Sequence, residues 1–284
     1  MSSLFISFQH IVPQHAVSRL IGSFAELSGP GWLRDRVIRW FIHRYDVDMC
    51  EAAEPDPGAY GSFNEFFTRP LRDGARPIAD ADIVCPADGA ISQIGGVSAG
   101  RILQAKGQSF SVAELLGGDH KRAAAYAEGA FATIYLSPRD YHRVHMPMAA
   151  KLTTARYVAG DLYSVNAVTA ENVERLFARN ERLVCHFETA AGPMVMVLVG
   201  AMVVAGIETV WSGRVVPAPR GVPAVSDLDV PAPPLTLARG EEMGRFFLGS
   251  TVILLFPTGV ASWQPGLAAG SGTRVGEALG SLSN

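Results

Sequence analysis

The sequence predicts an α+β fold, in which N-terminal amphipathic helices precede a single β-rich domain. Large apolar residues recur at helical spacing through the first 45 residues, whereas from Ile83 onward short apolar runs are divided by Gly, Asp and Pro. With 48% apolar residues, the 284-residue chain can bury a sizeable core. We therefore divide it into a helical arm with its linker, residues 1–61, and a β-rich domain, residues 62–284.

The arm contains two amphipathic runs, Val17–Leu27 and Trp32–Tyr45, separated by Gly29-Pro30-Gly31. Arginines accompany the aromatic residues, a composition suited to helices that lie in a bilayer interface beside anionic lipid. An ordinary helical hairpin packed on the core is the alternative. Glu51–Gly61 is the predicted linker, and the capping box Ser62–Glu65 opens a short helix that Pro70 ends.

The β-rich domain is predicted from short apolar runs. These runs are Ile83–Cys85, Ala90–Ile94, Ala130–Leu136, Leu183–Phe187, Met194–Val199, Ala201–Ile207 and the buried strand Phe246–Phe256. A helix is expected at Thr169–Phe177 with Thr169 as its cap, and an irregular surface segment at Val215–Pro234, which has six prolines. Thr189–Ile207 carries no charge, yet its glycines, proline and valines favour two buried strands over a transmembrane helix.

Charge and cysteine content narrow the class of protein. The net charge of −3 argues against nucleic-acid binding. Only three of the 24 cationic residues are lysines, and this arginine bias suits an anionic substrate or surface, although a GC-rich genome would also produce it. Three widely spaced cysteines and the lack of a signal peptide pattern indicate a reducing compartment.

A small Gly249-Ser250-Thr251 step interrupts the predicted last strand. A β-bulge or a tight bend would explain it structurally. Chemically, the Ser250 hydroxyl is held beside the Gly249 carbonyl, and glycine leaves that carbonyl open to attack. An acyl shift from nitrogen to oxygen then needs only a base and a strained or polarised peptide bond.

His142 and His145 are the candidate acid and base, because imidazole titrates near neutral pH. No third ligand with suitable spacing follows them, which argues against a metal site. Asp88 lies in an Asp-Gly turn signal and could instead orient a histidine. Purely structural roles for the two histidines and for the turn remain the alternative.

Three motifs occur in order along the chain: Pro86–Ser92, Leu136–Pro147 and Leu248-Gly249-Ser250-Thr251. Together they resemble the proenzymes of the phosphatidylserine decarboxylase family, which depend on a pyruvoyl group. The likeness extends from about Phe63 to Phe246, whereas the Gly- and Ala-rich tail after Pro257 does not align clearly with the family.

The resemblance implies that Asp88, His145 and Ser250 form a charge-relay triad that cleaves the chain between Gly249 and Ser250. A β chain of residues 1–249 and an α chain of residues 250–284 would result, with Ser250 converted to the pyruvoyl cofactor and no metal required. It also implies a Schiff base between that group and phosphatidylserine, yielding phosphatidylethanolamine and carbon dioxide, with His142 serving decarboxylation.

The same resemblance places the protein peripherally on the cytoplasmic side of the cell membrane, on an anionic surface, as a homodimer. Two other classes stay open on the residues alone. A Ser-His-Asp hydrolase would use Ser250 as a standing nucleophile, but the chain lacks a Gly-x-Ser-x-Gly elbow at this serine. A non-enzymatic β-rich module with a membrane-attached arm is the other alternative.

Overall fold

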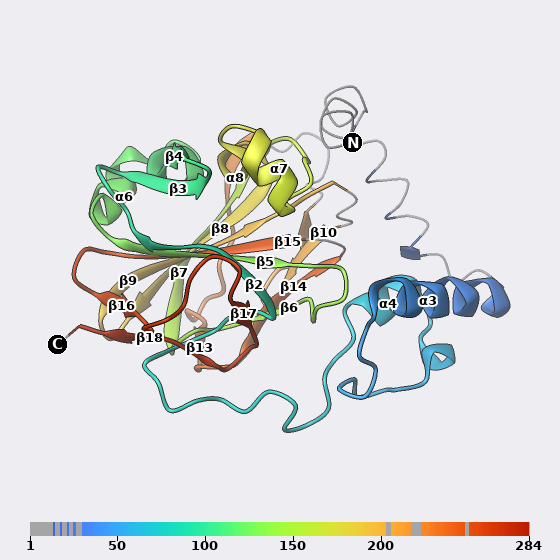
Figure 1. Cartoon of the computed structure of the whole chain (residues 1–284). Helices are drawn as coiled ribbons and strands as arrows, with labels where there is room; N and C mark the ends of the chain where they lie inside the picture. The colour runs from blue at the N-terminus through green and yellow to red at the C-terminus, as the bar shows by residue number, and fades with distance from the viewer. Residues whose placement is uncertain are drawn as a thin grey trace.

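A computed structural model describes residues 30–202, 206–216, 223–247 and 250–283, together with Gln14, Ser18, Gly22, Ala25 and Glu26. Helices of the arm lie beside a β-rich domain (Figure 1), as the sequence predicts. Much of the first predicted helix, Val17–Leu27, falls outside the described residues, but Ser18, Gly22, Ala25 and Glu26 are helical. No helix in the described ranges is long and apolar enough to cross a membrane.

The helical elements are α3 (Gly31–Tyr45), η1 (Pro57–Ala59), α4 (Phe63–Phe67), α5 (Val112–Leu115), α6 (His120–Ala123), η2 (Ala124–Tyr126), α7 (Ala167–Asn172) and α8 (Leu176–Arg179). The strands are β1 (Ile83–Val84), β2 (Gly89–Gly96), β3 (Arg101–Ala105), β4 (Gln108–Ser111), β5 (Ala130–Leu136), β6 (Arg143–His145), β7 (Ala150–Val158), β8 (Arg182–Thr189), β9 (Gly192–Val199), β10 (Gly206–Thr209), β11 (Gly213–Val216), β12 (Val225–Leu228), β13 (Thr236–Leu237), β14 (Glu242–Phe247), β15 (Ser250–Phe256), β16 (Ala261–Trp263), β17 (Gly272–Thr273) and β18 (Ala278–Leu282).

Helix α3 packs its Ile38 and Phe41 side against α4, and the Phe41 ring makes edge contacts with the rings of Phe66 and Phe67. Ser62 caps α4 as predicted, because its hydroxyl accepts a hydrogen bond of 3.1 Å from the Glu65 amide. Burial of these rings makes a small separate core, which α3 of the arm shares with α4 from the other side of the predicted boundary at residue 61, and it adjoins the strands through Phe247.

The largest sheet has nine strands, eight of which follow the order β12-β7-β8-β9-β15-β5-β2-β17, while β13 pairs with β7. Strand β15 is central: it pairs along its whole length with β5 on one side and, from Thr251 to Leu255, with β9 on the other. All seven of its residues are buried, which explains its continuous apolar sequence.

The two faces of this sheet support two separate cores. Val252, Leu254 and Phe256 face the core shared with the four-stranded sheet β11-β10-β14-β6 and the three-stranded sheet β1-β18-β16. Ile253 and Leu255 face the other core, which the β3-β4 hairpin and the short helices α5, α7 and α8 cover. Figure 1 shows those helices on one side of the sheet.

Several predicted boundaries are wrong. The helix expected at Thr169–Phe177 is two helices, α7 and α8. Asn166 caps α7, which ends at the extended residue Val173, and Arg175 precedes α8 in a left-handed conformation with φ of 54°. The strand expected at Ala201–Ile207 begins at Gly206 in the described part of the chain, and the segment expected to be irregular at Val215–Pro234 holds the edge strand β12. The weakly patterned tail forms β16, β17 and β18.

Candidate functional site

The predicted strand Phe246–Phe256 is in fact two strands in two different sheets. Strand β14 pairs with β6 and β10 and ends at Phe247, whereas β15 starts at Ser250 inside the large sheet. The intervening Leu248 and Gly249 lie outside the described residues. The chain therefore passes from the four-stranded sheet to the large sheet at the small-residue step. Because both strands are mostly apolar, the sequence pattern alone does not show this change of sheet.

Three strands bring the predicted residues to one end of the large sheet. Ser250 pairs with Leu136 at the end of β5, and the preceding β5 residue, Tyr135, pairs with Ala90 in β2. Asp88 immediately precedes β2, and the amide of His145 donates a hydrogen bond of 2.8 Å to the carbonyl of Pro86. The fold therefore gathers Asp88, His145 and Ser250, which are up to 162 positions apart in the numbering, at this end.

The Ser250 hydroxyl is fully buried and has no hydrogen-bond partner in the described part of the protein. It faces the same side of β15 as Val252, which is the side where β6 and β14 pack. A buried hydroxyl that makes no hydrogen bond costs free energy. Packing therefore does not explain a hydroxyl at the first residue of this central strand.

Asp88 is held by an ion-pair network and not by His145. The Nε of Arg76 donates to the two Asp88 carboxylate oxygens at 3.0 and 3.1 Å, and the Val275 amide donates to the same carboxylate at 2.8 Å. Arg76 also pairs with Glu51 at 2.6 Å, and Glu51 pairs with Arg274 at 2.8 Å. The carboxylate is thereby fixed by Arg76, which the linker residue Glu51 holds in turn, and by the C-terminal tail.

These contacts also set the charges of the network. Burial alone would lower the pKa of Arg76, but its hydrogen bonds to Asp88 and Glu51 outweigh burial and raise that pKa. The hydrogen bond from Arg76 lowers the pKa of Glu51. The ion pairs therefore persist across the physiological pH range.

His145 is a neutral imidazole in a defined tautomer. Its Nδ1 lies 2.8 Å from the carbonyl oxygen of Gly240, and because a carbonyl only accepts, Nδ1 carries the proton. Nε2 is then an acceptor, and it receives the Tyr141 hydroxyl at 3.0 Å. Burial lowers the pKa of His145, while the Gly240 hydrogen bond and the charges of Glu242 and Asp88 oppose that shift. The Nε2 lone pair can therefore act as a base once the Tyr141 hydroxyl no longer donates a hydrogen bond to it.

The structure therefore joins no two of Asp88, His145 and Ser250 by a hydrogen bond. The Gly240 carbonyl orients the imidazole, which is the position that the sequence assigns to Asp88. Burial lowers the pKa of His145, and the negative charge of Asp88 opposes that shift, although no hydrogen bond joins the two side chains.

His142 is more deeply buried than His145. It is completely buried, with its ring 4.1 Å from the Phe67 ring between centroids, and its Nδ1 donates to the Asp140 carbonyl over 2.8 Å. Its Nε2 has no partner in the described ranges. Burial lowers the pKa of His142 to about 3. The result is a neutral imidazole with an unused lone pair.

The lowered pKa values of the buried histidines predict how the free energy of unfolding depends on pH. His142 titrates near 6.5 when unfolded but near 3 when folded, so its contribution is complete above about pH 6.5 and is lost as the pH falls toward 3. The thermal midpoint should therefore fall between pH 7.5 and 5, with up to about 1.4 kcal/mol lost per pH unit for each such histidine.

His142→Gln should reduce this pH dependence, whatever its effect on stability at pH 7.5. The exposed His120 provides the control, since His120→Gln should leave the dependence unchanged. Equal dependence in His142→Gln and the wild type would contradict the assignment.

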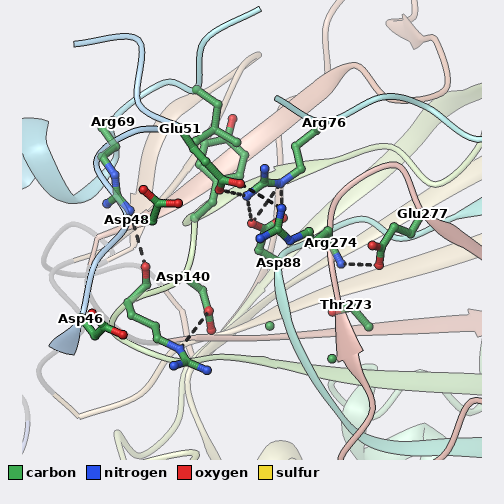
Figure 2. A pocket seen from close by; sticks show the side chains of 15 residues that line it. Asp46, Asp48, Glu51, Arg69, Arg76, Asp88, Asp140, Thr273, Arg274 and Glu277 are labelled. Carbon is green, nitrogen blue, oxygen red and sulfur yellow. Dashed lines mark hydrogen bonds and ion pairs between the residues drawn. The ribbon is translucent and has the colours of Figure 1, made fainter. Parts of the chain in front are cut away.

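A polar cavity of about 420 Å³ opens beside Asp88 (Figure 2). Gly89 and Tyr141 line it from the end of the large sheet, and Arg69, Arg76 and Arg274 line it together with several carboxylates. The sequence does not predict Arg76 or Arg274, because each reaches the site from a segment whose local pattern carries no chemical signal. Tyr141 lies within the predicted motif Leu136–Pro147, beside His142, but its sequence position alone indicates no role. Among the described residues, no group of His, Cys, Asp and Glu side chains could hold a metal ion.

Two family models and several known proteins match the chain, and together they cover nearly its whole length. The family model described as Phosphatidylserine decarboxylase matches residues 63–281, and a second, described as PSD, matches residues 4–46. The chain is 56% identical over 279 residues to the phosphatidylserine decarboxylase proenzyme of Chromobacterium violaceum, covering 98% of this chain and 99% of the relative. Proenzymes from Marinobacter nauticus and Pseudomonas aeruginosa are each 55% identical, with 96% or more of both chains covered in each pair.

Proposed function

The chain belongs to the phosphatidylserine decarboxylase family, and from this premise we propose that it converts phosphatidylserine to phosphatidylethanolamine with a pyruvoyl group made from its own Ser250. The observation that carries the proposal is the buried, unpartnered Ser250 hydroxyl at the passage between two sheets, at the same end as His145 and Asp88. A hydrolase that keeps Ser250 as its nucleophile would remain a single uncut chain, so self-cleavage distinguishes the proposal from this alternative.

Self-cleavage starts with attack of the Ser250 Oγ on the carbonyl carbon of Gly249. His145 Nε2 takes the hydroxyl proton and returns it to the departing Ser250 nitrogen, so that the C–N bond breaks and an ester forms. The negative charge of Asp88 stabilises the imidazolium, and the Gly240 carbonyl keeps Nδ1 protonated and the ring oriented. Tyr141 must release Nε2 for this step, because its hydroxyl occupies the lone pair in the uncut chain.

Elimination across the Cα–Cβ bond of residue 250 then releases the β chain with a Gly249 carboxylate. Hydrolysis of the remaining dehydroalanine expels ammonia and leaves the pyruvoyl group at the start of the α chain. The position fits this group, since the residue that carries it stands first in a central strand with its main chain held by β5. When formed, the group supplies an electrophilic ketone, conjugated with an amide, that accepts the electrons released as carbon dioxide departs.

His142 is the proposed residue for the proton that replaces carbon dioxide. Its Nδ1 hydrogen bond to the Asp140 carbonyl fixes the ring, and its buried Nε2 is unpartnered and able to carry a proton. Because burial keeps the resting ring neutral, Nε2 first takes a proton from water, and the low pKa of the protonated ring then favours passing that proton to the substrate carbon.

The two proposed chains stay associated after cleavage. Strand β15 of the α chain lies between β5 and β9 of the β chain, and the α-chain residues Arg274 and Val275 contact Glu51 and Asp88. Separation would expose the buried β15 and break the Arg274–Glu51 ion pair and the hydrogen bond from the Val275 amide to Asp88.

Helix α3 supports a peripheral position on an anionic, cytoplasmic membrane surface. Trp32, Arg36, Trp40 and Arg44 are four residues apart, so they share one face of the helix, and all four are exposed. Trp32 and Trp40 expose 70% and 59% of their surface. The opposite face of α3 packs on α4, so the tryptophans are available to the interface while the helix remains part of the fold.

Replacing both tryptophans should weaken membrane binding without affecting maturation. We expect the Trp32→Ser/Trp40→Ser variant to bind anionic vesicles at least about tenfold more weakly in co-sedimentation, because two large apolar side chains no longer enter the interface. Val225→Ser removes an exposed apolar side chain from the edge strand β12 and should bind as the wild type does. Unchanged binding of the tryptophan variant would assign α3 a purely structural role.

The function itself is tested on the purified wild-type protein. A denaturing gel should show two chains without added protease, and the protein should release carbon dioxide from phosphatidylserine. One uncleaved, inactive chain would reject the proposal.

A further inference from the structure

Two buried arginines lack a carboxylate partner within 4 Å in the described part of the chain, and their surroundings differ. Arg182 is 2% exposed and donates to the carbonyls of Leu115, Asn180 and Glu114 at 2.7–2.8 Å. These contacts explain its burial as structural.

Arg69 has no comparable set of acceptors. It is 4% exposed, its Nε is buried without any partner, and its one hydrogen bond, to the Arg139 carbonyl, is long at 3.5 Å. Its guanidinium also lies 5.3 Å from the centre of the Phe66 ring. A buried guanidinium left with so few acceptors is costly unless an anion joins it.

Arg69 lines the polar cavity beside Asp88, where it is the arginine without an ion pair among the described lining residues. Arg76 and Arg274 are engaged by Asp88 and Glu51, and Arg139 by Asp140. Figure 2 shows the Arg69 guanidinium apart from the cluster around Arg76, with Asp48 beside it. Among the arginines that line the cavity, Arg69 alone is buried without an ion pair to a described carboxylate.

We propose that Arg69 binds the phosphodiester of the phosphatidylserine headgroup in this cavity. The inference rests on the proposed function and adds the headgroup site to it. A guanidinium binds phosphate oxygens through parallel hydrogen bonds, and the unpartnered Nε is one of the donors of that fork. The cavity opens at the end of the sheet where Ser250 begins β15, since Asp88 and Gly89 line it, and a headgroup seated there lies at the same end as that residue.

The carboxylates of the lining favour a headgroup over a simple anion. Asp46 and Asp48 line the cavity without an ion pair among the described residues, and they oppose a small anion more than a headgroup whose ammonium offsets one of its two negative charges. Glycerophosphoserine, which carries the complete headgroup, should therefore bind more tightly than inorganic phosphate.

The first experiment measures binding by calorimetry in the Ser250→Ala chain, so that no pyruvoyl group is needed. Arg69→Gln should weaken glycerophosphoserine binding by about 10- to 100-fold, the loss expected for a charged hydrogen-bonded contact, and Arg69→Lys should restore part of it. Free serine, which has no phosphate, should bind equally with and without Arg69. Arg182→Gln is the matched buried control: it should lower the thermal midpoint and leave glycerophosphoserine affinity unchanged.

The second experiment measures decarboxylation by the mature enzyme, where Arg69→Gln should raise KM for phosphatidylserine by a similar factor with a smaller change in kcat. The proposal is overturned by wild-type affinity and KM in Arg69→Gln, by a loss of serine affinity, which would assign Arg69 to the carboxylate, or by equal affinity for inorganic phosphate and glycerophosphoserine. If the wild type is neither cleaved nor active, yet Arg69 is needed for glycerophosphoserine binding, the proposed function fails and the headgroup site stands.

Discussion

Ser250→Ala should leave one full-length chain with no decarboxylase activity. The variant removes the only atom that can attack the Gly249 carbonyl from within residue 250, so neither the ester nor the pyruvoyl group can form. The effect should be complete, because no other step can supply the ketone. Intact mass spectrometry would give a single mass for the uncut chain, and a carbonyl-reactive hydrazine would not label it.

Thr251 provides a closely matched control. Its hydroxyl is also completely buried and unpartnered in the described part of the chain, but the alternation of β15 directs it to the other face of the sheet. Thr251→Ala should therefore be cleaved and active. Processing of Ser250→Ala at the wild-type rate would refute self-cleavage at this residue, and an uncleaved Thr251→Ala would show that the site tolerates no change in the strand.

His145→Ala and His142→Ala should fail at different stages, although the two residues are three positions apart. Without His145, no group takes the Ser250 proton, and cleavage should slow by about 10²- to 10⁴-fold. Asp88→Asn should also slow cleavage, because it removes the charge that stabilises the imidazolium. His142→Ala should mature into both chains and react with a hydrazine, but its kcat should fall by about 10²- to 10⁴-fold.

His186 provides the control for the loss of a buried histidine outside the proposed site. It too is buried with an unpartnered Nε2, and burial lowers its pKa to about 4, but it lies on β8 beside a different cavity. His186→Ala should be cleaved and active. The measurement is intact mass followed by a decarboxylation assay, in which the mature α chain is lighter than the same chain beginning with serine. An uncleaved His142→Ala protein would assign both histidines to maturation, and full activity would leave His142 a structural role.

Asp88, the proposed orienting residue for self-cleavage, is bound from two distant segments of the chain. Its carboxylate is fixed by Arg76 from the segment after the arm and by the Val275 amide from the tail. Because Glu51 binds both Arg76 and Arg274, the linker and the tail meet at the site before cleavage. The contacts that hold the Asp88 carboxylate are therefore present in the uncut chain.

The sequence alone determined the features that depend on neighbours along the chain. Ser62 caps α4, β5 spans the predicted Ala130–Leu136, and β9 contains the predicted Met194–Val199, because capping and strand alternation are local. The same holds for the family resemblance and for the candidates Asp88, His142, His145 and Ser250, whose roles remain predictions.

Only the tertiary structure decided the partners of those candidates. The division of Phe246–Phe256 between two sheets, the Arg76–Asp88 ion pair, the Gly240 contact to His145 and the isolation of Arg69 all depend on pairings between distant segments. Hydrophobic periodicity specifies which side of an element is buried, but not which element covers it, because burial is non-directional. The chemistry of the site is therefore set by contacts that form only when the sheets close on one another.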